Sequence, residues 1–122
     1  MDRVTFERLV AEVLDELPPA FQEKLDNVDV VIEDWPSHET LRRAGARHPA
    51  HLMGFYQGVP QTKRSRRYGL VLPDKIILFR GPIERHARTE RDVQRLIRRV
   101  LRHEIGHHFG LDDDRLRDIG AY

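Results

Sequence analysis

The sequence contains no cysteine, no long apolar run and no internal repeat. Without cysteine the chain can form neither disulfides nor thiolate metal sites, so a metal ion would have to be bound by imidazole nitrogen or carboxylate oxygen. No apolar stretch approaches the length of a membrane span, and the N-terminal segment MDRVTFERLV is too charged for a secretory signal. We therefore expect a cytoplasmic protein with no membrane contact.

Net charge is also nearly absent, because the 34% of charged residues almost cancel to +1. A balanced charge gives no reason to expect a nucleic-acid partner. Two basic runs stand out, KRSRR at 63–67 and RRVLR at 98–102. A solvated loop and the solvated face of a helix account for them without any ligand.

The spacing of apolar residues predicts an α+β fold in which residues 1–122 form a single domain. Asp2 is the expected cap of an N-terminal helix, and Thr89 is the expected cap of a C-terminal helix. The expected helices are 3–17, 20–25 and 90–109, and the expected strands are 28–34, 53–58, 68–72 and 75–80, the last two as a hairpin. Between the first two strands, residues 35–49 read as an irregular connection with a helical turn at 39–44.

Three of the seven histidines lie in the stretch HEIGHHFGLDDDRL, at residues 103–116. His103 and His107 are four residues apart, so one helical turn brings both imidazoles to the same side, where they can reach one zinc ion. Glu104 projects between this side and the apolar stripe, where it can contact a metal-bound water. H-E-x-x-H on a helix is the arrangement of zinc hydrolases in which the glutamate is the general base.

The continuation of the stretch extends the pattern to H-E-x-x-H-x-x-G-x-x-D, which has metzincin spacing with aspartate in place of the last histidine. The helix cannot supply a third ligand on the same side, so the chain must turn back, and Gly110 gives the backbone that freedom. Asp113 can then complete the ligand set, with Asp112 or Asp114 as alternatives. His108 falls on the apolar stripe, which favours a buried or supporting histidine over a ligand.

This stretch, 103–116, resembles the signature of a small bacterial family of zincin-like metallopeptidases, described as minimal matrixin-like proteins. The segments MGFYQGVP (53–60) and LPDKIILFRGPIER (72–85) also resemble that family, so the similarity covers most of the chain. The resemblance implies a reduced zincin-like fold, in which a small mixed sheet packs against an N-terminal helix and the active-site helix lies across the face of the sheet. It also implies that an edge strand binds a peptide or protein substrate in extended conformation.

The resemblance further implies that His103, His107 and Asp113 bind one catalytic Zn²⁺ ion and that Glu104 is the catalytic base. We therefore expect a zinc metalloendopeptidase. Zinc would lower the pKa of its bound water towards ~7, and Glu104 would accept the proton as the hydroxide attacks the peptide carbonyl.

Two alternatives remain open. Small zinc endoribonucleases that mature ribosomal RNA have histidines four apart on a similar helix, although glycine occupies the position of Glu104 there. The second alternative is a metal-stabilised peptide-binding domain without activity. Both methionines, Met1 and Met53, precede the motif, so the methionine turn of larger metzincins is missing, and only nine residues follow Asp113.

Overall fold

The computed structural model describes residues 1–58 and 72–110. Its helices and strands follow the chain in an order that mixes the two types. They are α1 (Arg3–Glu16), α2 (Pro19–Lys24), the 3₁₀ turn η1 (Leu25–Asn27), β1 (Val28–Glu33), α3 (His38–Ala44), the 3₁₀ turn η2 (Pro49–His51), β2 (Gly54–Gln57), β3 (Asp74–Phe79), α5 (Arg80–Arg85) and α6 (Glu90–His108). The predicted α+β class is confirmed.

The two long helices begin where the sequence places their caps. The Asp2 carboxylate accepts a hydrogen bond from the Thr5 N–H, and the Thr89 hydroxyl accepts one from the Asp92 N–H. Each side chain thereby satisfies an amide that has no partner within its helix. Pro18 follows the end of α1, as expected.

The helical turn predicted at 39–44 is confirmed as α3, which begins at a Ser37 cap and ends at Gly45 in left-handed conformation (φ 71°). The short helix α5 differs from the prediction. Arg80, predicted as the last residue of a strand, is instead the first residue of α5. The Gly81 N–H donates to the Asp34 carbonyl at 2.8 Å, and this contact from a distant segment stabilises a helix too short to be marked locally.

The described strands form one sheet in the order β1-β3-β2. β3 pairs in parallel with β1, placing Val28 opposite Asp74, and antiparallel with β2, placing Gly54 opposite Leu78. The expected mixed sheet is therefore confirmed. Asp74 is already part of β3, and residues 68–71 of the proposed hairpin partner lie outside the described residues.

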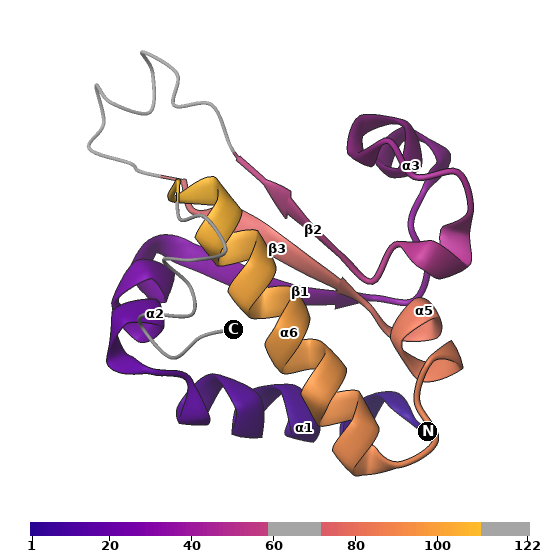
Figure 1. Ribbon diagram of the computed structural model, residues 1–122, viewed down its shortest axis with the longest axis horizontal. Helices are drawn as coiled ribbons and strands as arrows, with labels where there is room; N and C mark the ends of the chain where they lie inside the picture. The colour runs from indigo at the N-terminus through magenta and orange to yellow at the C-terminus, as the bar shows by residue number, and fades with distance from the viewer. Residues whose placement is uncertain (59–71, 111–122) are drawn as a thin grey trace.

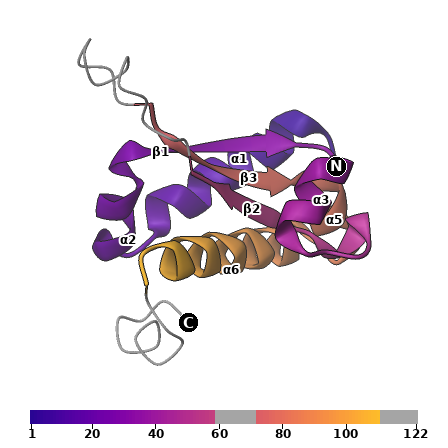
Figure 2. The same cartoon turned by 90° about the horizontal axis from the view of Figure 1, so that it is seen from above.

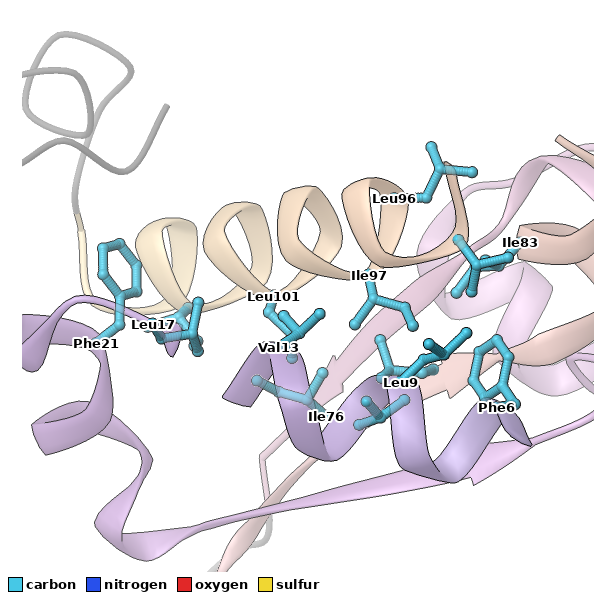
Figure 3. Close-up of a cluster of buried hydrophobic side chains, with 14 residues drawn as sticks. Phe6, Leu9, Val13, Leu17, Phe21, Ile76, Ile83, Leu96, Ile97 and Leu101 are labelled. Atoms are coloured by element: carbon cyan, nitrogen blue, oxygen red, sulfur yellow. The ribbon is translucent and has the colours of Figure 1, made fainter. Parts of the chain in front are cut away.

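The core lies between one face of this sheet and the helices α1 and α6. Figures 1 and 2 show α6 along one side of the sheet, with α1 packed against it, α2 at one end, and α3 with α5 at the other. Ile97 and Leu101 of α6 face Leu9 and Val13 of α1 in Figure 3, and all four are at most 2% exposed. Burying such side chains stabilises the fold by about 1.5–3 kcal/mol each before entropy is counted. This packing fixes α6 relative to the strands.

No helix in the described ranges is both long and apolar enough to cross a membrane.

Candidate functional site

The C-terminal turns of α6 carry the histidine pair that the sequence predicts as metal ligands. The ring centroids of His103 and His107 are 5.4 Å apart, with an angle of 79° between the ring planes. Two imidazoles that share one tetrahedral zinc ion have ring centres on the order of 5 Å apart. The two side chains are close enough to bind the same ion, and their role as ligands stays a prediction.

Glu104 is partly buried beside this pair. Burial raises the pKa of its carboxyl group, and a hydrogen bond with the Tyr56 backbone and the charge of His107 lower it by less. A carboxylate with a raised pKa is a stronger base, which suits proton transfer near neutral pH. Burial therefore makes the Glu104 carboxylate a stronger base than an exposed one, and its role as the catalytic base stays a prediction.

Gly110 leaves the helix in the conformation that the sequence predicts. Its φ is +74°, in the left-handed region, and its N–H donates to the His107 carbonyl at 3.2 Å. A glycine in this conformation commonly ends a helix. The left-handed bend predicted at Gly110 is confirmed, and the predicted return of the chain towards the histidines falls on residues outside the described ranges.

The predicted third ligand lies beyond that bend. Asp113 and the alternatives Asp112 and Asp114 are outside the described residues. Within residues 1–58 and 72–110, no three His, Asp or Glu side chains are grouped so that they could hold one ion. The described part of the site therefore comprises two imidazoles and the neighbouring glutamate.

Of the two alternatives predicted for His108, burial is wrong, since 39% of its side chain is exposed, and a supporting role stays a prediction. Its ring stacks on the Tyr56 ring, with centroids 3.7 Å apart and planes within 12°. The Tyr56 hydroxyl donates to Asp74 Oδ2 at 2.8 Å, so it is engaged with that carboxylate. Burial and this carboxylate raise the tyrosine pKa well above its usual value. The sequence did not predict this pair, because only the register of β2 on β3 brings Tyr56 and Asp74 together.

A groove of about 340 Å³ adjoins the histidine pair. It runs between α6 and the segment that leads from η2 into β2, and His103 and Glu104 form one end of it. Apolar side chains supply much of its wall and Arg99 lies at its rim. The lining residues are His51, Leu52, Met53, Gly54, Leu96, Arg99, Val100, His103 and Glu104. The groove therefore opens onto Glu104, the predicted catalytic group.

The remaining histidines are exposed, as the sequence predicts. They are His38, His48, His51 and His86. Arg98 of the basic run on α6 has an acidic partner, since it lies 3.3 Å from Glu16. Arg95, three residues before the run, lies 3.8 Å from Asp92. The Arg98 contact supports the structural explanation of that run, whereas the run at 63–67 lies outside the described residues.

Residues 25–121 match the sequence model of a family described as zincin-like metallopeptidase. The matched range contains the whole described sheet and α6, so it includes both histidines and Glu104. A search of curated proteins found none that matches the chain.

Proposed function

The chain belongs to the zincin-like metallopeptidase family, and from this premise we propose that it is a zinc-dependent peptidase in which Glu104 is the general base. His103, His107 and Asp113 would hold the ion. One grouping carries the proposal, namely two imidazole rings 5.4 Å apart beside a partly buried glutamate whose pKa is raised.

The donor set fits zinc. Imidazole nitrogen and carboxylate oxygen are both ordinary zinc ligands, and the two histidines come from one helix in the spacing that zinc hydrolases use. When bound, zinc would supply a Lewis acid that acidifies water and polarises the carbonyl group of the substrate.

Glu104 would move the proton. A water molecule held against its carboxylate gives up a proton to Glu104 while the water oxygen attacks the carbonyl carbon. When the C–N bond breaks, the same proton passes to the leaving nitrogen, and Glu104 returns to its ionised form. The products are a new carboxyl terminus and a new amine.

The substrate would lie along β2, which is the outermost described strand on the side of the site. An extended peptide can add to the edge of β2 away from β3 through main-chain hydrogen bonds. The groove between β2 and α6 would take one of its side chains, and Leu52, Met53 and Val100 favour an apolar one.

Two substitutions test the proposal. Glu104→Gln should retain zinc and lower peptide hydrolysis by at least about 10²-fold, because it removes the base and leaves the ligands in place. His103→Ala should lose zinc as well as activity. Elemental analysis of protein purified without chelators measures the metal, and an unbiased peptide library measures the activity, with His38→Ala on α3 as the control.

Full activity of Glu104→Gln would remove this residue from the mechanism, and unchanged zinc in His103→Ala would refute the ligand assignment. A parent protein that holds zinc and binds peptides without cleaving them would support the inactive binding domain instead. Cleavage of RNA by the same preparation would favour the ribonuclease alternative.

A further inference from the structure

Residues 107–110, the turn at the very end of α6, include no buried residue. Ile105 is fully buried, but the described residues after Gly106 are all exposed. Helix ends without packing partners fray readily, because their last carbonyl groups have no partner within the helix. His107, one of the predicted ligands, nevertheless lies in this turn.

This turn contacts the sheet through His108. The His108 ring lies flat against Tyr56 of β2 at a centroid distance of 3.7 Å. Tyr56 is in turn fixed by its 2.8 Å hydrogen bond to Asp74, the first residue of β3. Figure 1 shows the end of α6 close to the end of β2 and the start of β3.

Tyr56 also touches the other half of the site. Its backbone is hydrogen-bonded with Glu104, while its ring supports His108. A single residue of β2 therefore locates the predicted base and the turn of the second ligand relative to the same strand.

We propose that His108 is a positioning residue, which fixes the His107 turn through its stack on the Tyr56–Asp74 pair and so prepares the metal site. The proposal rests on the proposed function, because it presumes that His107 binds metal. The stack is the closer contact, since His108 Nε2 lies 3.7 Å from Asp74 Oδ2, beyond hydrogen-bonding distance. An aromatic ring without nitrogen should therefore replace the histidine in part.

The first measurement is amide hydrogen exchange on the metal-free chain. In His108→Ala, exchange at residues 107–110 should accelerate by roughly tenfold, while residues 93–101 of the same helix stay protected, because the core does not depend on the stack. His108→Phe should restore most of the protection. His38→Ala, which removes an exposed histidine from α3, is the matched control.

The second measurement is zinc affinity by competition with a chromogenic chelator. His108→Ala should bind zinc about 10-fold more weakly than the parent, the usual effect of losing a residue that orients a ligand. Tyr56→Phe keeps the ring and loses the bond to Asp74, so its effect should be smaller.

Unchanged exchange at 107–110 in His108→Ala would overturn the proposal. Faster exchange throughout α6 would also overturn it, since His108 would then contribute to the stability of the whole helix. A His108→Phe variant that exchanges as fast as His108→Ala would overturn it too. A parent protein that binds no zinc would refute the proposed function, and the exchange data would still decide whether the stack holds the turn.

Discussion

Glu104 carries a charge that the fold partly removes from water. Its pKa is raised chiefly by burial, so the folded chain binds this proton more tightly than the unfolded chain does. Stability from this group is fully present below the usual pKa of 4.5 and is lost as the pH rises through the raised value. The ionised base therefore weakens the metal-free fold at neutral pH.

Glu104→Gln should accordingly make the metal-free chain more stable at pH 7, since the amide keeps the shape and the hydrogen-bonding oxygen without the charge. The advantage over the parent should shrink towards zero as the pH falls below about 4.5, where the carboxyl is protonated in both states. Urea unfolding at pH 7 and pH 4 measures the difference. Glu23→Gln, at an exposed position of α2, is the control, and an equal loss of stability at both pH values would rule out the buried charge as the cause.

At the same scale, the histidine pair and the bend at Gly110 could be predicted from sequence, because both follow from spacing along one helix. The Tyr56–Asp74 pair and the stack of His108 could not. Tyr56 and Asp74 lie 18 residues apart, and the register of β2 on β3 brings them together. The packing of α6 on the sheet brings His108 to Tyr56. Helical periodicity placed His108 on the apolar stripe, but the stripe ends at Gly106.

At the scale of helices and strands, β2 and α6 approach so closely at Gly54 that no side chain fits between them. A Cβ added to Gly54 would overlap Val100 Cγ1 and lie 3.3 Å from the Ile77 carbonyl oxygen. Glycine therefore lets the edge strand approach the helix closely. The contact sits at the wall of the groove, so it sets the distance between the strand and the predicted base.

Gly54→Ala should destabilise the fold by about 1–3 kcal/mol, because the strand or the helix has to move. Adding Val100→Ala removes the methyl group that the new Cβ would overlap. The double variant should therefore be more stable than the sum of the two single effects predicts, by a coupling free energy above about 0.5 kcal/mol. Urea unfolding of the four combinations measures that coupling. Gly58→Ala is the control, since its Cβ would meet only Asp74 Oδ1 at 3.9 Å. Strict additivity would show that the two residues do not collide.

The elements themselves differ in how plainly the sequence marks them. α6 has a cap, an apolar stripe and a terminal glycine, and its predicted range of 90–109 agrees with the observed Glu90–His108. α5 has none of these marks, since Gly81 and Pro82 read as a turn. The Trp35 ring packs on Gly81 so closely that a Cβ would not fit there, and that tertiary contact could not be seen locally.

In the whole molecule, α1 and α6 form one packed layer on the sheet. A change at the end of α6 should therefore alter the free energy of unfolding of the whole fold. The parallel pairing of Val28 with Asp74, 46 positions later, joins the N-terminal half to the strand beside the site. Sequence patterns predicted the class and the mixed sheet. They did not predict the strand order, which depends on contacts between distant residues.

Zinc should therefore stabilise the entire fold. If the ion binds only the folded chain, free zinc at 100 times its dissociation constant adds about 2.7 kcal/mol to the free energy of unfolding. Thermal unfolding with and without zinc measures the effect, which His107→Ala should abolish and His38→Ala should retain. A zinc-dependent shift of equal size in His107→Ala would place the ion elsewhere.

Gly110, at the end of α6, has a backbone conformation that L and D residues tolerate differently. Its φ of +74° suits a residue of mirror-image configuration, and a Cβ there would meet nothing within 4 Å. In a semisynthetic chain, D-alanine at position 110 should therefore preserve the bend and raise stability by about 0.4–1 kcal/mol, through a less flexible unfolded chain. Gly110→Ala, with the ordinary L residue, should lower it by about 1–2 kcal/mol. If D-alanine raises the free energy of unfolding and L-alanine lowers it, the backbone conformation at position 110 depends on the chirality of the residue and not on room for a side chain.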